Sequence, residues 1–243
     1  MNILILAAGK PNTESSDTYP LCLTEIDGVP LVEKILSACA ELPMSNIIFA
    51  LRAEDVRRHH LDNVVKLLSP SAEIITVSDR VLGAACTALL AAEHINNDKE
   101  LLIVNGDSLI DIPYNSVLQK FRERGLDAGT ISFRSVHPRY SYVRLDENDL
   151  VVEAAEKNPI SRHATAGFYW YSSGKDFVRA AQSMIRKDAN VGGHYFICPA
   201  FNQLVLEHAK IGIHEIDSKQ YHQLKTEKQL SHYEASLDHA RYA

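Results

Sequence analysis

The amino terminus constrains the fold of this chain most strongly, because a short apolar run there ends in three small residues. Residues 3–6 are apolar without interruption, which is typical of a strand buried on both faces of a parallel sheet. Ala7, Ala8 and Gly9 follow, and their small side chains let another group approach the backbone. The loop after such a strand is a favoured nucleotide site in α/β proteins. A tight turn in which Gly9 only supplies a positive φ is the structural alternative.

Alternating strand and helix patterns follow this run and predict an α/β fold with a mostly parallel, Rossmann-like sheet covered by helices on both faces. We expect helices over residues 30–41, 54–68, 84–95, 115–124, 175–186 and 195–207 and from Glu227. We expect further strands over residues 46–51, 73–77, 101–104, 129–133 and 211–216. The patterns over residues 142–145, 150–154 and 165–171 are separated by turns and predict a small antiparallel addition. Because no repeat or linker interrupts the sequence, we predict a single domain over residues 1–243.

Charge and composition limit the binding partners and the cellular compartment that the sequence predicts. The net charge of −6 over 243 residues argues against a nucleic-acid partner, because phosphate backbones are bound by basic surfaces. No apolar run approaches the ~20 residues that a membrane-spanning helix needs. The four cysteines are far apart in apolar surroundings, as expected of reduced core residues. The amino terminus has no leader pattern, so these features predict a cytoplasmic protein without a membrane partner.

Asp107 is the candidate metal ligand. It follows Gly106 at the end of the apolar strand expected over residues 101–104, where a carboxylate is expected to face the crevice above the sheet. Mg²⁺ often takes only one or two protein oxygens together with substrate phosphates. An Asp that caps the next loop is the structural alternative. Asp111, four residues further along the chain, is a second candidate ligand for this site, although a role in stabilising a turn is favoured.

Glu156 and Lys157 end another expected strand and form a second candidate group. In a functional interpretation, Lys157 holds a phosphate as a point charge and Glu156 accepts hydrogen bonds from hydroxyl groups; a solvated surface pair is the alternative. Gly167 lies inside a strand pattern, where glycine often marks a bulge or a ligand close to the backbone. Gly83 and Ala84 begin a helix whose amide groups can bind an anion or a base edge, although helix packing explains these residues equally well.

An ordered series of motifs contains these residues: L-A-A-G, Y-P-L-C-L-T-E-I-D-G-V-P-L, G-A-A-C-T-A-L-L-A, N-G-D, R-Y-S-Y-V, E-K-N-P and T-A-G-F-Y-W-Y. In this order the motifs resemble the sugar-1-phosphate nucleotidyltransferases, which are nucleoside-diphosphate-sugar pyrophosphorylases with a glycosyltransferase-A-like fold. The resemblance runs from residue 1 to about residue 205 and is looser to about residue 230. It is nearest to members found among bacterial capsule and lipopolysaccharide genes. It implies a Mg²⁺-dependent reaction of a nucleoside triphosphate with a sugar phosphate that releases pyrophosphate.

The resemblance implies a role for each candidate residue. In a nucleotide-binding half (1–135), it implies that the loop around the nucleotide consists of Leu6, Ala7, Ala8 and Gly9. It implies further that Gly83 and Ala84 contact the base, and that Gly106 adjoins the Mg²⁺ ligand Asp107. In an acceptor-binding half (136–243), it implies that Glu156 and Lys157 hold the sugar phosphate and that Tyr140 and Gly167 lie along the sugar. Ser141 departs from the family, which has Gly after this Tyr.

The loop near the amino terminus departs further from the family. The family's loop continues as G-x-G-x-R, with an Arg that grips the triphosphate, and its next motif is P-K, with a catalytic Lys. Here no Arg precedes Pro20, and Leu21 follows it. Lys10 is the expected catalytic substitute because it lies in the nucleotide loop, with Arg80 and Arg139 as lesser candidates.

Three functions are compatible with these departures. The first is an active enzyme that joins a nucleoside triphosphate to a phosphorylated sugar or related small molecule, such as an amino-acid or choline phosphate. The second is a module of the same fold that binds a nucleotide or sugar nucleotide without turnover. The third is a glycosyltransferase, although Ser108 and Leu109 follow Asp107 where a D-x-D metal motif is expected. A homodimer is a further expectation, because pairing is common in this family.

Three more residues have assignments with open alternatives. His194 and Tyr195 are expected either beside the acceptor pocket or as a helix cap. Asp217 is a guess for a second metal ligand, because the family's closing motif is represented here only by K-T-E-K.

Overall fold

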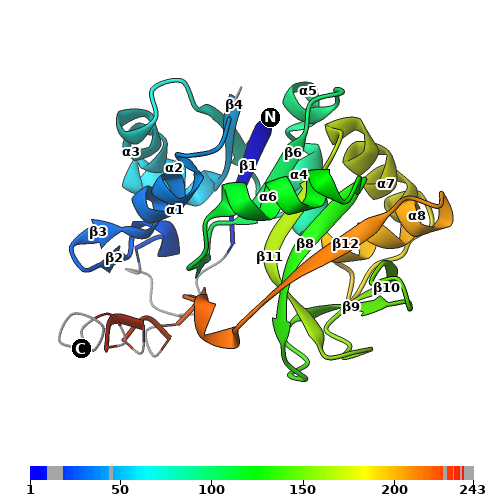
Figure 1. The fold of residues 1–243 in the computed structure, drawn as a ribbon. Helices are drawn as coiled ribbons and strands as arrows, with labels where there is room; N and C mark the ends of the chain where they lie inside the picture. The colour runs from blue at the N-terminus through cyan, green and yellow to red at the C-terminus, as the bar shows by residue number, and fades with distance from the viewer. Residues whose placement is uncertain (10–18, 44–45, 227–228, 232, 236, 238–243) are drawn as a thin grey trace.

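β1 (Asn2–Ala7) lies in the middle of the sheet, as its apolar sequence predicts. The structure is a computed structural model, and it describes residues 1–9, 19–43, 46–226, 229–231, 233–235 and 237. β1 pairs in parallel with β4 (Asn46–Arg52) on one side and with β6 (Leu101–Asn105) on the other, and β5 (Glu73–Val77) continues beyond β4. These parallel strands place their carboxyl ends along one edge of the sheet (Figure 1).

β11 (His163–Tyr171) extends the sheet beyond β6, to which it is antiparallel. Its other edge pairs with β8 (Ala128–Arg134), which in turn pairs in parallel with β12 (Ile211–Ile216). The strand pattern over residues 165–171 therefore forms an antiparallel strand, as predicted, and it lies within the main sheet between β6 and β8. The addition itself consists of β9 (Ser141–Leu145) and β10 (Val151–Glu156), joined to the first residues of β11.

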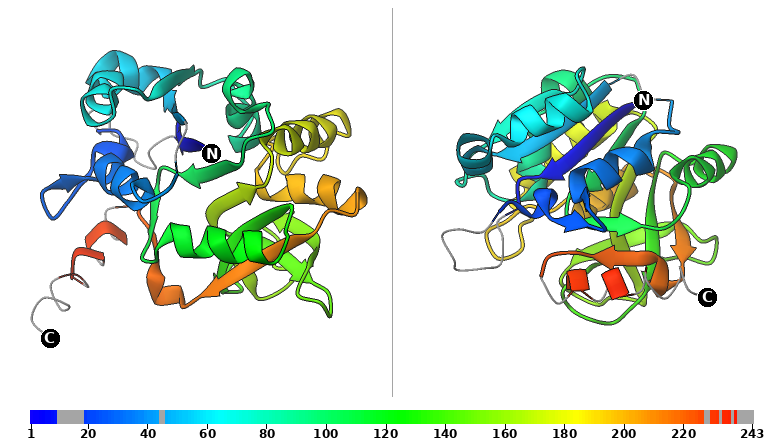
Figure 2. Two further views of the ribbon diagram at one scale, coloured as in Figure 1. Left: turned by 45° about the horizontal axis from the view of Figure 1, so that its top comes forward. Right: turned by 90° about the vertical axis from the view of Figure 1, so that its left-hand side faces the viewer.

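Helices cover both faces of this sheet (Figures 1 and 2), and each layer has its own hydrophobic core. Ile3 and Ile5 face one layer and Leu4 faces the other, because side chains alternate along a strand. The first layer contains α1 (Leu31–Cys39), α2 (Ala53–His59), α3 (Leu61–Leu68) and α6 (Tyr114–Glu123). The second contains α4 (Ala84–Leu89), α5 (Ala92–Ile95), α7 (Gly174–Arg186) and α8 (Phe201–Leu206). The prediction of an α/β fold with a mostly parallel sheet, helices on both faces and a small antiparallel addition is thus confirmed.

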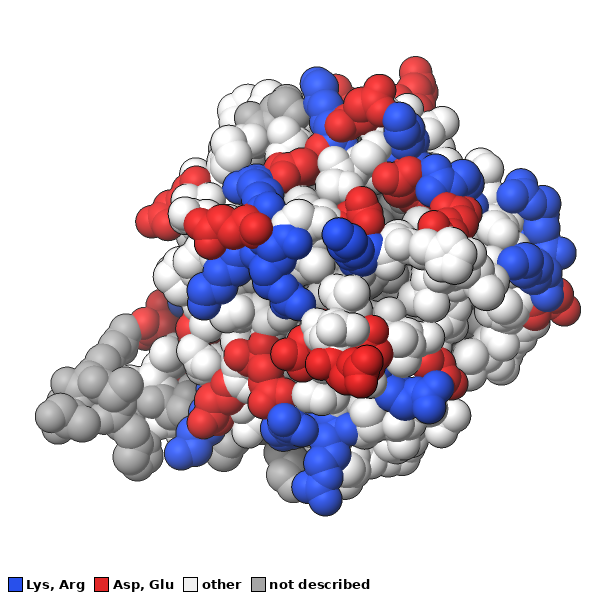
Figure 3. Space-filling view, turned by 45° about the vertical axis from the view of Figure 1, so that its right-hand side comes forward, with Lys and Arg blue, Asp and Glu red and all other residues white. Residues whose placement is uncertain are grey.

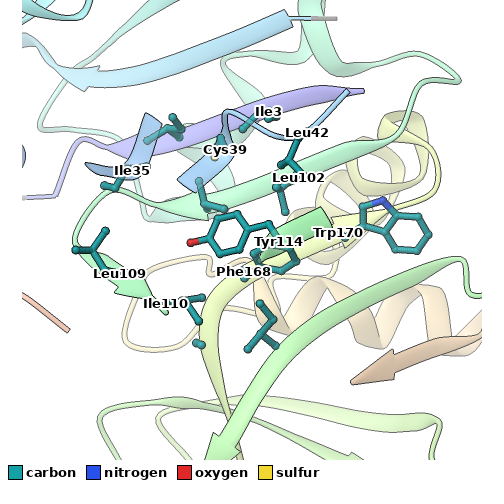
Figure 4. Packing of buried hydrophobic residues seen from close by; sticks show 14 of the residues in the cluster. Ile3, Ile35, Cys39, Leu42, Leu102, Leu109, Ile110, Tyr114, Phe168 and Trp170 are labelled. Carbon is teal, nitrogen blue, oxygen red and sulfur yellow. The ribbon is translucent and has the colours of Figure 1, made fainter. Parts of the chain in front are cut away.

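The first core shows why α6 lies where it does. Tyr114 packs edge-on against Phe168 of β11, with 5.0 Å between the ring centroids (Figure 4). Ile3 and Leu102, from β1 and β6, lie in the same cluster. Tyr114 therefore packs α6 against the face of the sheet that β1, β6 and β11 share.

Three predicted helices differ from the structure. The helix over residues 54–68 is broken at His60, whose left-handed φ of 51° ends α2, a conformation that apolar periodicity does not reveal. The helix over residues 84–95 is two short helices, α4 and α5. The helix over residues 195–207 begins only at α8, because a 3₁₀ turn containing Pro199 precedes it. Glu227, where the closing helix was predicted to begin, lies outside the described residues.

Several short elements were missed because two or three residues carry no periodic pattern. They are the hairpin of β2 (Glu25–Ile26) and β3 (Val29–Pro30), the antiparallel pair of β7 (Ser108–Ile110) and β13 (Tyr221–Gln223), and the 3₁₀-helices η1 (Leu21–Leu23), η2 (Cys198–Ala200) and η3 (Ser218–Gln220). The pair of β7 and β13 matters most, because it joins the carboxyl-terminal segment to the residues that follow β6.

The surface carries mixed charge. Figure 3 shows basic and acidic side chains interspersed over the face that it presents. Some of the ion pairs are close: Arg179, for example, contacts Asp176 at 2.7 Å and Glu207 at 2.6 Å. Within the described residues, no helix has the length and apolar character needed to cross a bilayer.

Candidate active site

A cleft with a volume of about 540 Å³ opens at the carboxyl ends of the parallel strands. The residues to which the resemblance assigns a role line this cleft wherever the structure describes them: Leu6, Ala7, Ala8, Gly9, Gly83, Ala84, Gly106, Asp107, Tyr140, Glu156, Lys157 and Gly167. Lys10, the predicted catalytic substitute, lies outside the described residues. Positions far apart in the sequence are thus brought together, whereas the individual roles stay predictions.

Gly106 fixes the position of the turn that contains Asp107 (the candidate metal-site turn) against the loop after β1. Leu6 and Asn105 are register partners in the parallel pair of β1 and β6, and the Gly106 amide donates to the Leu6 carbonyl at 2.9 Å. A Cβ atom on Gly106 would lie 2.8 Å from the Cβ atom of Ala7, so any larger residue would separate the two loops. The absence of a side chain lets Asp107 lie directly beside the loop after β1.

Asp107 has one carboxylate oxygen in an ion pair and the other without a partner in the described part of the chain. Its Oδ2 is 3.0 Å from Nζ of Lys225, and its carbonyl accepts a hydrogen bond of 2.9 Å from the Leu224 amide. Its Oδ1 is buried and has no hydrogen-bond partner among the described residues. A buried, unpartnered carboxylate oxygen is a suitable ligand for a hard cation such as Mg²⁺.

The two other acidic residues considered for this site have structural partners instead. Asp111 lies 2.6 Å from Nε2 of His222. Asp217 caps η3, where its side chain accepts a hydrogen bond of 2.8 Å from the Lys219 amide, and it is not among the described residues that line the cleft. These contacts give Asp217 a capping role and lend no support to the guess that it is a second metal ligand, which stays a prediction. Over the described part of the chain, no group of three or more His, Cys, Asp or Glu residues could hold a metal ion.

Glu156 is held at the end of β10 by the antiparallel pairing with β9. Ser141 is its register partner, and the Ser141 hydroxyl donates a short hydrogen bond to Glu156 Oε2. Burial raises the pKa of Glu156, and this effect is opposed by the Ser141 hydrogen bond and by the positive charges of Lys157 and Lys225. The alternative of a solvated surface pair fails for Glu156, whose side chain is buried.

Lys157 turns out of the strand in a strained conformation. Its φ is +54°, in the left-handed region that side chains other than glycine avoid. Its amide donates to the Tyr140 carbonyl at 3.0 Å, and its Nζ lies 5.0 Å from the ring centroid of Phe196. This backbone turn directs an ammonium group into the cleft beside Glu156.

We expect Glu156→Gln to raise the free energy of unfolding at pH 7 but not near pH 4. Between the ordinary Glu pKa and the raised value, the folded state binds more protons than the unfolded state, so wild-type stability falls as pH rises through this window. Gln keeps the acceptor for Ser141 and cannot ionise. Urea denaturation at both pH values measures the difference, with the exposed Glu147→Gln as control. An equal difference at both pH values would contradict the burial argument.

Gly167 marks a bulge at which β11 changes neighbours. Before it, Ala164 pairs with Tyr142 of β9; after it, Phe168 pairs with Val104 of β6. Its φ is +73°, and an added Cβ atom would lie 2.4 Å from Nδ2 of Asn105. The sequence prediction of a bulge is confirmed, and this bulge opens the sheet where the cleft lies.

Gly167→Ala should destabilise the fold more than Gly125→Ala does. Gly125 has a φ of +58° with no atom within 4 Å of an added Cβ, so it measures the cost of a left-handed conformation alone, about 1 kcal/mol. At Gly167 the Asn105 side chain must also move, which adds about 1–3 kcal/mol. Chemical denaturation of both variants tests the difference, and equal losses would show that Asn105 gives way freely.

The opposite wall of the cleft begins at Gly83 and α4. The Ala85 amide donates to the Tyr195 carbonyl at 3.0 Å, and the Tyr195 amide donates to the Leu82 carbonyl at 2.9 Å. Helix packing therefore accounts for part of the small-residue pattern, while Gly83 and Ala84 still line the cleft. Among the described residues His194 lines the cleft and Tyr195 does not; the Tyr195 hydroxyl donates to Asp188 at 2.7 Å.

Two further carboxylates that line the cleft, Asp79 and Asp55, were missed by the sequence analysis. Asp79 follows β5 and accepts two hydrogen bonds from the Arg52 guanidinium, at 2.7 and 2.8 Å. Asp55 lies in α2 and is 5% exposed; burial raises its pKa, and the charge of Arg52 opposes the shift. Neither residue lies in a motif: Asp79 reaches the cleft from the carboxyl end of the parallel strand β5, and Asp55 reaches it through the packing of α2 against β4 and β5.

The comparison with known families decides the assignment. Residues 13–214 match the family model described as Nucleotidyl transferase. This chain belongs to the nucleotidyl transferase family. A Sulfolobus acidocaldarius protein assigned as a mannose-1-phosphate guanyltransferase is 27% identical over 157 residues, which is 63% of this chain. The match covers 42% of that protein, so the chain spans about two fifths of the length of this curated relative.

Solved structures share the fold of this nucleotidyl transferase at low identity. The nucleoside-diphosphate-sugar pyrophosphorylase from Vibrio cholerae RC9 has a TM-score of 0.79 and 18% identity, and the match covers 97% of this chain and 100% of that one. A UDP-glucose pyrophosphorylase complexed with UDP-glucose has a TM-score of 0.78 and 13% identity, with 98% of each chain covered. These likenesses concern the fold alone.

The cationic side chains that line the cleft of this nucleotidyl transferase are only in part those expected from the sequence. Of the described lysine and arginine residues, Arg139, Lys157 and Lys225 line the cleft, whereas Arg80 does not. The Arg139 guanidinium lies 4.7 Å from the ring centroid of Tyr140. The sequence analysis gave Lys225 no role, because only the pairing of β7 with β13 brings it to Asp107.

Proposed function

We propose that this chain is a Mg²⁺-dependent nucleotidyltransferase that joins a nucleoside triphosphate to a sugar phosphate, or a similar phosphorylated acceptor, in the synthesis of a surface polysaccharide. In this reaction an oxygen of the acceptor phosphate attacks the α-phosphorus, the bond from that phosphorus to the bridging oxygen breaks, and pyrophosphate leaves. The family match and the names of the relatives support this class of reaction. The observation that carries the proposal is the position of Asp107 in one cleft with Glu156 and Lys157.

The residues of the cleft divide into two sets that suit the two substrates. The loop after β1 and the start of α4 offer small residues and backbone groups, which suit a flat base and a phosphate chain. Glu156 and Lys157 offer a buried carboxylate for acceptor hydroxyl groups and an ammonium for the acceptor phosphate. Catalysis of this kind depends mainly on positioning and on cationic stabilisation of phosphate charge.

The side chains fit a magnesium ion at Asp107. Its free Oδ1 is buried and lacks a partner within the described residues, and Mg²⁺ is commonly held by one or two carboxylates together with substrate phosphates. When bound, Mg²⁺ would neutralise charge on the triphosphate. Asp107 would hold the ion, and Lys157 would orient the acceptor phosphate.

A second function, binding without turnover, is favoured by the residue at position 21. Leu21 lines the cleft where the resemblance places a catalytic lysine, and loss of one preorganised charge typically costs on the order of 10²–10³ in rate. In the enzyme, Lys10 and the cations of the cleft would replace the lost charge. In a binding module, nothing replaces it.

Pyrophosphate release distinguishes the two functions. The purified protein is incubated with Mg²⁺ and each of CTP, UTP, dTTP, GTP and ATP, against a panel of sugar 1-phosphates and choline phosphate. Release with one pair is the result expected of the enzyme, and Lys10→Ala should then abolish it. If no pair reacts while a thermal-shift assay still detects nucleotide or sugar-nucleotide binding, the chain is a binding module.

A further inference from the structure

Among the described cations that line the cleft, Lys225 forms an ion pair with a carboxylate. Its Nζ lies 3.0 Å from Asp107 Oδ2, the carboxylate that is the candidate metal ligand. Of the other described cations that line the cleft, Lys157 lies over the ring of Phe196 and Arg139 over the ring of Tyr140. The free protein therefore already holds one positive charge where the divalent cation is expected.

The contact between Lys225 and Asp107 is set by the backbone. Gln223 is the register partner of Ser108 in the antiparallel pair of β13 and β7, and the Leu224 amide then donates to the Asp107 carbonyl at 2.9 Å. Lys225 follows directly, so the ladder delivers the base of its side chain to the candidate metal-site turn. The side chain itself is 42% exposed and has a flexible stem, which leaves the ammonium free to change partners.

The same ammonium affects both carboxylates of the site. It is paired with Asp107, and its positive charge also lowers the pKa of Glu156 from the value that burial alone would give. A divalent cation bound to Asp107 would repel an ammonium held at the same carboxylate. Asp107 Oδ1 has no hydrogen-bond partner among the described residues, so an oxygen is available to the incoming ion before the ammonium leaves.

We propose that Lys225 occupies the metal position of Asp107 in the free protein and transfers to substrate phosphate when a divalent cation binds that carboxylate. This inference rests on the proposed function for the identity of the phosphate group. One ion pair, Lys225 with Asp107, is exchanged for two: Asp107 with the metal ion, and Lys225 with a phosphate oxygen. Metal and phosphate binding are then coupled with positive cooperativity, because each removes a partner that competes with the other. Lys225 thereby supplies one of the cations that the loop sequence lacks.

Binding of Mn²⁺ alone tests the first half of this proposal without any turnover. Lys225→Met keeps the length of the side chain and removes its charge. We expect the variant to bind Mn²⁺, followed by electron paramagnetic resonance, on the order of tenfold more tightly than the wild type, because the competing cation is gone. Lys219→Met, on the exposed surface of η3, is the matched control and should bind as the wild type does. Equal Mn²⁺ affinities of Lys225→Met and wild type would overturn the proposal.

Inorganic tripolyphosphate, which has no base or sugar, tests the second half. We expect Lys225→Met to weaken binding of the Mn²⁺–tripolyphosphate complex on the order of tenfold, and binding of metal-free tripolyphosphate much less, because Asp107 holds the ammonium when no metal is present. An equal loss with and without metal, or no loss, would overturn the exchange. Lys225→Gln repeats both measurements with a polar side chain, in case the Met variant does not fold.

These measurements fail separately from the proposed function. If the wild type releases no pyrophosphate and binds no nucleoside triphosphate, the proposed function is wrong. The Mn²⁺ affinities of the Lys225 and Lys219 variants still decide whether the ammonium occupies the metal position.

Discussion

Asp107→Asn is expected to lower the rate of pyrophosphate release by about 10³-fold. Asn keeps the size of the side chain and the backbone hydrogen bond from Leu224 to the residue 107 carbonyl. It loses the negative charge that a divalent cation requires, and it leaves the Lys225 ammonium without its carboxylate. The rate measured with saturating Mg²⁺ and the substrate pair found for the wild type gives the comparison.

The fold should survive this change. The ion pair of Asp107 with Lys225 is partly exposed, with side-chain exposures of 23% and 42%, so its loss should change the free energy of unfolding by at most about 1 kcal/mol. Asp217→Asn is the matched control, because its carboxylate caps η3 and Asn is an equally good cap. If Asp107→Asn retains more than a tenth of the wild-type rate, Asp107 is not the ligand on which the reaction depends.

Much of the fold follows from short-range patterns in the sequence. The apolar runs of β1 and β6 and the alternation of strands with helices indicate the mostly parallel sheet and its two helical layers. Helix boundaries were predicted less accurately. His60 ends α2 because its backbone is left-handed, and α4 and α5 are separate helices although one run of mostly small apolar residues contains both. Breaks of this kind depend on single backbone angles, which periodicity does not record.

The candidate site was predicted where a motif supplies both the residue and its position at a strand end. Asp107 lies two residues after the end of β6, and Glu156 is the last residue of β10, so the topology of the sheet brings both to the cleft. Lys225 and Asp55 carry no such signal, since they reach the cleft only through tertiary packing of β13 and α2. Asp217 was chosen by its place near a motif, and in the structure its side chain caps η3.

Lys157→Met is expected to lower kcat/KM for the phosphorylated acceptor by about 10²–10³-fold, while the affinity for the nucleoside triphosphate stays unchanged. This ammonium belongs to the residue that directly follows β10, and it lies in the cleft next to the buried Glu156. Removing it leaves the acceptor phosphate without its point charge and also removes a charge that lowers the pKa of Glu156. Steady-state kinetics with varied acceptor, together with nucleotide-induced thermal shifts, separate the two affinities.

Two further variants show whether charge or conformation is responsible. Lys175→Met removes an exposed lysine that is paired with Asp98 on the surface, and it should leave kcat/KM unchanged. Lys157→Arg keeps the charge and should recover part of the loss, since guanidinium and ammonium both bind phosphate but with different geometry.

The left-handed φ of +54° at Lys157 costs about 1–2 kcal/mol, and a strained residue is retained only where its surroundings hold it in place. Should Lys157→Met bind and turn over the acceptor as the wild type does, the strain at this position would have no connection with the acceptor, and the wall formed by β9 and β10 would not be its binding site.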